Sequence, residues 1–392
     1  MTEQTKEKSA GVYQQNHIDV LDGIRAVTIT IIVWFHFWQQ TWIMPIWGKF
    51  NIDWIPRSGS ICVDMMILLS GFCLFLPYAR QMVYGTETVS AKEFYIKRAA
   101  RIMPSYYASV FICLLFFALP LGEYTGKTFM IKDLATHIFF VNNFWADTLI
   151  STKLNLVLWT VAVEIQLYIL FPFIARCFQK KPVLTYCVMV SVGLLSCWYI
   201  SANADIINLR LYVNHTLTFF SVFANGMLGA WAYIAVTKET KPSKASETLF
   251  FALTMLGLTL YKMMCKNYTA SQNGSKWQVD NRFLLSLVFL LLLFSILMAQ
   301  RIFQPVLGNK LMGFLAGISF NMYIWHQYIA VKLKEFRIPY WEGNVPPNQL
   351  GDRVWMWKYQ ILCIAVSLAV AVAMTYLIEK PLSKVIIKKF KK

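Results

Sequence analysis

Two ionisable residues, Arg25 and His36, interrupt an apolar stretch near the start of the chain, LDGIRAVTITIIVWFHFW. Their spacing corresponds on an α-helix to three turns plus about 20°, so both side chains share one face, about 16 Å apart along the axis. Ionisable groups in such a helix face a protein interior or a wet cavity rather than lipid. Because neutral imidazole accepts protons, His36 is a candidate base for a hydroxyl group. Arg25 would orient His36 indirectly or hold an anion. The alternative is that Arg25 reaches the headgroups and His36 bonds a neighbouring helix.

Three basic residues, Lys97, Arg98 and Arg101, form a second candidate site in the segment KRAARIMPSYY. Residues three apart on a helix project to the same side, so Arg98 and Arg101 present two guanidinium groups together. Pro104 follows near the expected start of this helix, where proline is tolerated. Guanidinium groups match the geometry of phosphate oxygens, so the pair would suit the phosphates of a nucleotide-bearing donor. The alternative is a basic loop that only sets membrane topology.

A lone carboxylate, Glu164, falls near the centre of the apolar segment LWTVAVEIQLYILFP, between Trp159 and Tyr168. Such a group is costly in a membrane unless it is paired or protonated. We therefore expect an ion pair with Arg25 or a hydrogen bond to His36. A catalytic role is compatible with the second arrangement, since a carboxylate bound to one imidazole nitrogen fixes the tautomer of the ring.

Two further helices carry polar residues that could contact a substrate. Asp64 lies near one end of the segment VDMMILLSGFCLF and is a better candidate than Ser70 for binding a polar acceptor. Ser319, Tyr323 and His326 are spaced at i, i+4 and i+7, which places them on one helix face. That stripe either contacts an acceptor or packs against neighbouring helices with its outer end in water.

The composition shows which elements must position these residues. Hydrophobic residues make up 57% of the 392 residues and charged residues only 15%, against roughly a quarter charged in soluble domains. Because a membrane span needs about 20 mostly apolar residues, the sequence predicts an all-α, polytopic membrane bundle of about ten transmembrane helices. The predicted spans are 24–43, 60–79, 102–121, 155–175, 183–200, 215–236, 248–264, 283–299, 312–331 and 355–378.

The basic residues gather in the polar joints and in the tail KVIIKKFKK, with a net charge of +17. This pattern favours anionic membrane lipids over nucleic acid as the partner. An even number of spans puts both termini on one side, and that side carries more Lys and Arg, which predicts cytoplasmic termini. The expected organisation is a cytoplasmic tail at 1–18, a transmembrane domain at 19–382 and a basic cytoplasmic tail at 383–392.

The cysteine spacing argues against disulfide or metal sites, and the N-terminal residues argue against a cleaved signal peptide. The eight cysteines are spread singly, without a CxxC pair or a histidine at metal spacing, so we expect packing roles and no metal cofactor. The residues before Arg25 lack the apolar core and cleavage site of a signal peptide, so we expect the first helix to be retained.

Taken in order, these motifs resemble those of the acyltransferase family 3 membrane proteins over residues 19–381. Arg25, ten residues and His36 match the family's first-helix signature, and Arg98-Ala-Ala-Arg101 matches its Arg-any-any-Arg motif. The other similar segments are VDMMILLSGFCLF with Ser-Gly-Phe, LWTVAVEIQLYILFP with Trp-to-Glu-to-Tyr, ISFNMYIWH with Ser-to-Tyr-to-His, and IEKP with the closing Glu-any-Pro. Ala162 and Ile165 depart from the family pattern, which leaves the acceptor undefined.

The resemblance implies transfer of an acyl group, expected to be acetyl, from cytoplasmic acetyl-CoA or another acyl-CoA. The implied acceptor is a hydroxyl of an extracytoplasmic glycan or cell-surface polysaccharide, and the implied location is the cytoplasmic membrane. His36 would be a general base or a transient acyl carrier. The bundle would act alone or pass the acyl group to a separate extracytoplasmic transferase. The expected site residues are His36, Arg25 and Glu164 for catalysis, Arg98, Arg101 and Lys97 for the donor, and Asp64, Trp159, Tyr323 and His326 for the acceptor.

Two other classes of protein fit parts of this pattern. In a secondary transporter, Arg25, His36 and Glu164 would line a proton or substrate path. The sequence shows no internal repeat and no pair of Gly/Pro-broken helices at matching places in two halves, which argues against that class. A membrane receptor or scaffold would not need a buried Arg, His and Glu.

Overall fold

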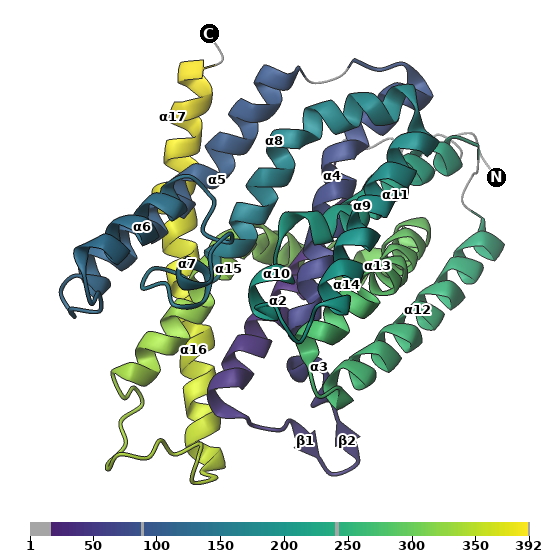
Figure 1. Cartoon of the computed structure of the whole chain (residues 1–392). Coiled ribbons are helices and arrows are strands. Elements are labelled where there is room, and N and C mark those ends of the chain that lie inside the picture. Colours follow the sequence, from purple (N-terminus) through teal and green to yellow (C-terminus); the bar gives the residue numbers. More distant parts are fainter. Residues whose placement is uncertain (1–16, 88–89, 240–242, 391–392) are drawn as a thin grey trace.

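Long helices account for most of the computed structural model of this chain, which describes residues 17–87, 90–239 and 243–390 (Figure 1). The helices are α2 (Asp19–Thr41), α3 (Trp54–Arg57), α4 (Cys62–Tyr84), α5 (Ala91–Cys113), α6 (Lys127–Ile138), α7 (Ala146–Ile150), α8 (Leu158–Lys180), α9 (Pro182–Ala202), α10 (Leu209–Tyr212), α11 (Phe220–Glu239), α12 (Lys244–Ala270), α13 (Gly274–Met298), α14 (Gln300–Leu307), α15 (Lys310–Glu335), α16 (Arg353–Ala373) and α17 (Lys380–Phe390). Short 3-10 turns lie at η1 (Gly59–Ile61) and η3 (Thr216–Phe219), and π-helical turns at η2 (Leu114–Ala118) and η4 (Met374–Glu379). Strands β1 (Ile46–Trp47) and β2 (Phe50–Asn51) pair as an antiparallel hairpin.

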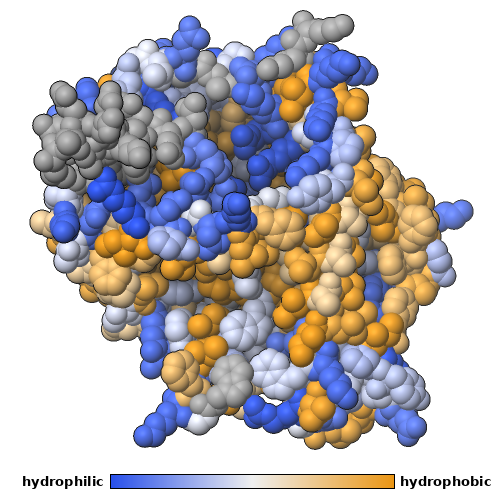
Figure 2. Space-filling view, turned by 180° about the vertical axis from the view of Figure 1, so that it is seen from behind, coloured by the Kyte–Doolittle hydropathy of each residue, from blue (hydrophilic) through white to orange (hydrophobic). Residues whose placement is uncertain are grey.

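The predicted membrane bundle is confirmed. Within the described part of the chain, nine helices are long and apolar enough to cross a membrane, and they coincide with nine of the ten predicted spans. The tenth, 312–331, falls inside α15, a helix of 26 residues that is not among the nine and that packs against α2 and α16. In Figure 2 a band of apolar side chains crosses the molecule between two hydrophilic layers.

The bundle has two ends, which we name by the elements that lie there. The start of α2 and the end of α17 lie at one end, called the α17 end, and the β1–β2 hairpin lies at the other, called the hairpin end (Figure 1). The predicted tail at 1–18 falls almost wholly outside the described residues, as do the last two lysines of the predicted tail at 383–392.

Glycines allow close contact between the helices that surround the site. A Cβ atom on Gly71 of α4 would collide with the backbone oxygen of Phe223, and one on Gly226 of α11 would collide with the backbone oxygen of Leu68. Small residues are used in this way where membrane helices approach closely. The tight α4–α11 pair fixes the rotation of α4, which carries Asp64 and Ser70 toward the candidate site.

Helix α5 begins earlier than the sequence predicts. Ser90 caps it by accepting a hydrogen bond from the backbone N–H of Glu93 at 3.2 Å, as serine does at helix starts. Arg98 and Arg101 therefore lie within the helix, one turn apart. The prediction that Pro104 stands near the helix start is wrong, because Pro104 is an interior residue of α5.

The segment between α5 and α8 is held together by a buried carboxylate, Asp133 of α6. Its Oδ2 atom accepts hydrogen bonds from the Tyr124 hydroxyl at 2.9 Å, from the Thr152 hydroxyl at 3.0 Å and from the backbone N–H of Lys153 at 3.0 Å. The Nδ1 atom of His137 lies 3.3 Å from Oδ1. Both Asp133 and His137 are fully buried. This cluster fixes the loop that supplies Ile150 and Leu156 to the candidate site.

Candidate active site

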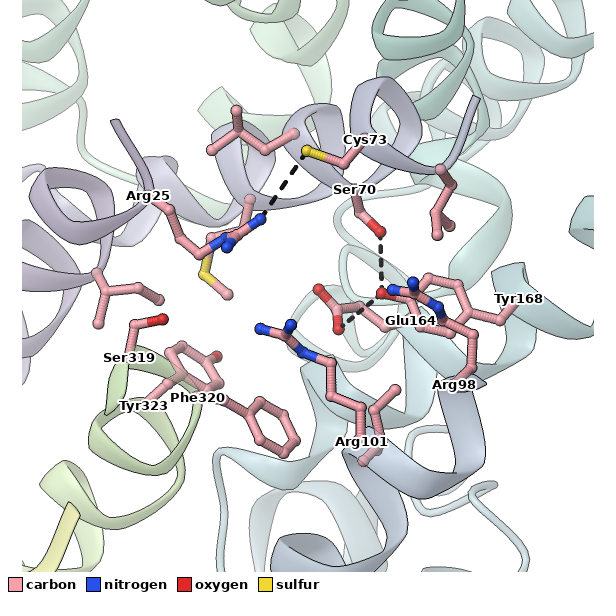
Figure 3. Close-up of a pocket in the computed structure, with 15 residues that line it drawn as sticks. Arg25, Ser70, Cys73, Arg98, Arg101, Glu164, Tyr168, Ser319, Phe320 and Tyr323 are labelled. Carbon is pink, nitrogen blue, oxygen red and sulfur yellow. Dashed lines mark hydrogen bonds between the residues drawn. The ribbon is translucent and has the colours of Figure 1, made fainter. Parts of the chain in front are cut away.

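A cavity of about 120 Å³, which we call the arginine cavity, lies among α2, α4, α5, α8 and α15 (Figure 3). Three guanidinium groups line it, from Arg25 of α2 and from Arg98 and Arg101 of α5. Among the described residues that line it, Glu164 is the one acidic residue. The cavity therefore has an excess of positive charge, which favours an anionic ligand. The other lining residues are Ile29, Met66, Leu69, Ser70, Cys73, Leu74, Ile102, Tyr168, Ser319, Phe320 and Tyr323.

Tyr168 organises one wall of the arginine cavity. Its hydroxyl lies 3.0 Å from Ser70 Oγ and donates to Glu164 Oε2 at 3.4 Å. The bond from Ser70 ties α4 to α8, and the contact with Glu164 orients the carboxylate toward the arginines (Figure 3). Within the described residues, Glu164 makes no ion pair shorter than 4.0 Å. The expected ion pair between Glu164 and Arg25 and the expected bond between Glu164 and His36 are therefore not formed.

Arg25 has other contacts that hold its side chain. It makes an ion pair with Asp22, one turn earlier, at 3.4 Å and donates to Cys73 Sγ at 3.9 Å. Lys97, the third basic residue predicted on the donor side, pairs instead with Glu93 at 2.7 Å. Lys97 does not line the arginine cavity.

A second cavity of about 330 Å³, which we call the histidine cavity, opens nearer the hairpin end. His36, Asp64, Trp159 and Tyr323 line it, and all four belong to the residues predicted to act on the acceptor side or in catalysis. Its other polar lining residues are Gln39, Ser60, Arg210, Asn214, Tyr268, Ser275, Gln278, Arg282 and Gln327. Such a lining, rich in amide and hydroxyl groups, matches a ligand with many hydroxyls.

Gln39 orients His36 within this cavity. The amide oxygen of Gln39 lies 2.9 Å from Nδ1 of His36, and His36 precedes Gln39 by one turn of α2. Because a carbonyl oxygen can only accept, the proton of the neutral imidazole sits on Nδ1. The Nε2 atom then carries the free lone pair, which is the state that a general base needs.

His326 lies directly beside His36, with their ring centroids 5.0 Å apart. His326 is fully buried, and its Nδ1 donates to the backbone oxygen of Tyr323 at 2.6 Å. The structure thus brings the predicted stripe on α15 against the predicted stripe on α2. His326 does not itself line either cavity.

The two cavities meet at Tyr323, which lines both of them. Its hydroxyl lies 2.7 Å from Thr160 Oγ1 of α8, and both residues are buried. Arg25 faces one cavity and His36 faces the other, although both belong to one face of α2. The arginines and the imidazole therefore lie in adjoining cavities that share Tyr323 as a lining residue.

Sequence reasoning missed Gln39, Thr160 and Arg282. Gln39 follows His36 by three positions, so its contact with the ring follows from helix geometry and could have been found. Thr160 and Arg282 reach the site only through contacts between helices. Among the described residues, no group of three or more His, Cys, Asp or Glu could hold a metal ion.

Comparison with known proteins identifies the family of this chain. A family model described as "Acyltransferase domain" matches residues 18–376. The chain is 21% identical over 348 residues to "O-acetyltransferase OatA" of Staphylococcus aureus, covering 86% of this chain and 54% of that protein. It is 22% identical over 350 residues to a "Putative O-acetyltransferase" of Staphylococcus aureus strain COL, covering 85% and 53%. This chain thus spans about half the length of the curated relatives it matches. No solved structure matches it at a comparable level.

Proposed function

This chain belongs to the acyltransferase family whose domain covers residues 18–376, and on that basis we propose that it transfers an acyl group, acetyl above all, from acyl-CoA to a hydroxyl group of a glycan. The donor is cytoplasmic acetyl-CoA, and the acceptor is an extracytoplasmic glycan or cell-surface polysaccharide. The protein spans the cytoplasmic membrane with both termini in the cytoplasm.

One observation carries this proposal. A cavity with three arginines and a cavity with an oriented imidazole adjoin at Tyr323 in the middle of a membrane bundle. A transfer across the membrane needs this arrangement, because the donor approaches from one side and the acceptor from the other.

On the donor side, Arg98 and Arg101 bind the phosphates of coenzyme A, and Arg25 stabilises negative charge closer to the reacting carbonyl. Arginine suits this task because its planar fork bonds phosphate oxygens in pairs and stays protonated at every working pH. Glu164 offsets part of the repulsion among the three guanidinium groups. Lys97, on the same helix, contributes only long-range positive charge.

On the acceptor side, His36 Nε2 removes the proton from the acceptor hydroxyl as the oxygen attacks the thioester carbonyl. A new C–O bond forms, the C–S bond breaks, and the imidazolium returns the proton to the departing thiolate of coenzyme A. In a second route, His36 Nε2 attacks the thioester carbonyl, so that an N–C bond forms and the C–S bond breaks as the thiolate of coenzyme A leaves. The acceptor oxygen then attacks the acyl carbon, the N–C bond breaks, and the thiolate takes the proton of the acceptor hydroxyl. Asp64, Trp159 and Tyr323 position the acceptor in both routes, and His326 acts on it only through the neighbouring ring of His36.

Whether the bundle completes the transfer alone is a separate part of the proposal. The residues 19–382 form the membrane domain that moves the acyl group across the membrane. Either the glycan enters the histidine cavity, or a separate extracytoplasmic transferase receives the acyl group there.

The test is transfer by the purified protein in detergent or nanodiscs. We expect release of coenzyme A from acetyl-CoA together with acetyl esters on surface polysaccharide, and loss of both in His36→Ala. The control is Val27→Ala, an exposed position of the same helix. Turnover that survives in His36→Ala contradicts the catalytic assignment. Uptake of a solute by proteoliposomes without any acyl donor would instead favour a transporter.

A further inference from the structure

A buried ion pair, Asp64 with Arg282, forms part of the wall of the histidine cavity. Nε of Arg282 lies 3.2 Å from Oδ1 of Asp64, and each side chain is only 2% exposed. The two residues come from α4 and α13, far apart in the sequence. A buried ion pair is weak evidence for stability, because its desolvation offsets much of the attraction. Stability alone therefore does not account for this pair.

Arg282 is immobilised by contacts other than Asp64. Its Nη1 atom donates to the backbone oxygen of Val213 at 2.8 Å and to Thr218 Oγ1 at 2.5 Å. Its guanidinium carbon lies 4.1 Å from the centre of the Phe219 ring, within the range of a cation–π contact. These contacts hold the guanidinium in place whether or not Asp64 is present. Arg282 thus positions Asp64, whereas Arg282 itself is held mainly by its other contacts.

Asp64 has one carboxylate oxygen that no described residue bonds. Oδ2 is buried and accepts no hydrogen bond from the described part of the chain. Leaving such an acceptor unsatisfied costs free energy, more for a charged group than for a neutral one. Because Asp64 also lines the histidine cavity, a ligand in that cavity is the natural donor to this oxygen.

The cavity around Asp64 indicates the chemistry of that ligand. Gln39, Gln278 and Gln327 line it, and each amide both donates and accepts hydrogen bonds. The indole of Trp159 and the ring of Tyr268 add flat apolar surface to the lining. Hydroxyl groups on a carbon ring satisfy both kinds of surface, whereas an apolar chain would leave the amides unpaired.

We propose that Asp64 and Arg282 form the subsite that selects the acceptor. Oδ2 of Asp64 accepts a hydrogen bond from a second hydroxyl of the glycan, next to the hydroxyl that His36 deprotonates. Arg282 is a positioning residue that fixes the direction of the carboxylate. The acceptor is therefore a sugar held by at least two hydroxyls, and an alcohol with a single hydroxyl is a poor acceptor. This inference rests on the proposed acyl transfer.

The alternative is that the pair only ties α4 to α13, and a charge-conserving substitution separates the alternatives. Asp64→Glu keeps the negative charge beside Arg282 but moves the carboxylate by one methylene. A tie between helices tolerates this change, whereas an acceptor subsite does not.

The experiment measures the apparent KM for polysaccharide purified from cells that lack this gene, with coenzyme A binding and the thermal midpoint measured in parallel. We expect Asp64→Asn and Asp64→Glu to raise this KM at least tenfold, as the loss of a hydrogen bond to a charged group does. The Kd for coenzyme A should stay within about twofold of the parent, since the arginine cavity is untouched. The thermal midpoint of Asp64→Glu should stay close to that of the parent protein, because the negative charge beside Arg282 is kept.

Two results overturn the inference. One is an unchanged KM in Asp64→Glu, and the other is an unchanged KM in a folded Asp64→Asn variant. Should Asp64→Asn fail to fold, Asp64→Glu decides, because it retains the negative charge beside Arg282. Absence of acyl transfer by the parent protein would refute the proposed function itself. If the parent protein transfers acyl groups and its Asp64 variants do so equally well, only the acceptor subsite is refuted.

Discussion

The amide oxygen of Gln39 accepts a hydrogen bond from Nδ1 of His36 over 2.9 Å. This contact leaves the Nε2 lone pair of His36 directed away from its own helical turn and available to a proton. In many enzymes a carboxylate holds the other nitrogen of a catalytic imidazole. Here a neutral amide does so, and Glu164, the nearby carboxylate on α8, lines the other cavity.

Replacing His36 tests the base directly. We expect His36→Ala to lower the rate of acyl transfer at least a hundredfold, because a positioned general base contributes roughly 10²–10⁴-fold. The measurement is acetyl ester formed per unit time at saturating acetyl-CoA. Binding of coenzyme A, measured by calorimetry, should be unchanged, since His36 does not line the arginine cavity.

Replacing Gln39 tests how the imidazole is oriented. Gln39→Leu removes the acceptor and frees the ring to adopt the other tautomer, so we expect transfer to fall about tenfold, the worth of one hydrogen bond. Gln39→Glu retains an acceptor oxygen and should keep more activity than Gln39→Leu. Equal activity in the two variants would show that this contact does not position His36.

The donor site can be tested with a matched control on the same helix. Arg98→Ala and Arg101→Ala should each raise the Kd for coenzyme A about ten- to hundredfold, because each removes a charge-assisted hydrogen bond. Lys97→Ala removes the same charge at a residue that pairs with Glu93 outside the cavity. We expect this substitution to change the Kd for coenzyme A less than threefold. A larger effect of Lys97→Ala would place the phosphates on the outer face of α5 instead.

The stability of the loop that lines the histidine cavity should depend on pH through Asp133. Burial raises the pKa of Asp133, but the hydrogen bonds from His137, the backbone of Lys153 and Tyr124 outweigh burial and hold the pKa below its usual value. A depressed folded-state pKa contributes stability that is present above the unfolded pKa of about 3.9. That contribution is lost as the pH falls through the folded value.

We therefore expect Asp133→Asn to reduce the free energy of unfolding at pH 7 by about 1–3 kcal/mol and to flatten its dependence on pH below about 4. Thermal unfolding in detergent between pH 7 and pH 3 measures both effects. The control is Asp147→Asn, since Asp147 makes a half-exposed ion pair with Lys132 at 2.6 Å. Exposed pairs of this kind contribute about 0–1 kcal/mol. A parallel pH dependence in the two variants would exclude Asp133 as its source.

The membrane bundle and the shared face of Arg25 and His36 could be predicted from the amino-acid sequence. Both follow from local rules: apolar residues in runs of sufficient length must span a membrane, and a fixed rotation per residue sets which side chains share a face of one helix. The same rules placed Ser319, Tyr323 and His326 on one stripe. Helix α5 shows their limit, because its start depended on the cap at Ser90 and not on the apolar run that begins later.

How those faces meet became apparent from the packing of the helices in the folded chain. This packing separated Arg25 and His36 into two cavities with Tyr323 between them, directed Lys97 away from the donor side, and joined Asp64 to Arg282. Each of these outcomes depends on the rotation and depth of one helix against another. Side-chain packing among several helices fixes those quantities, and the spacing of residues within a single helix carries no information about them.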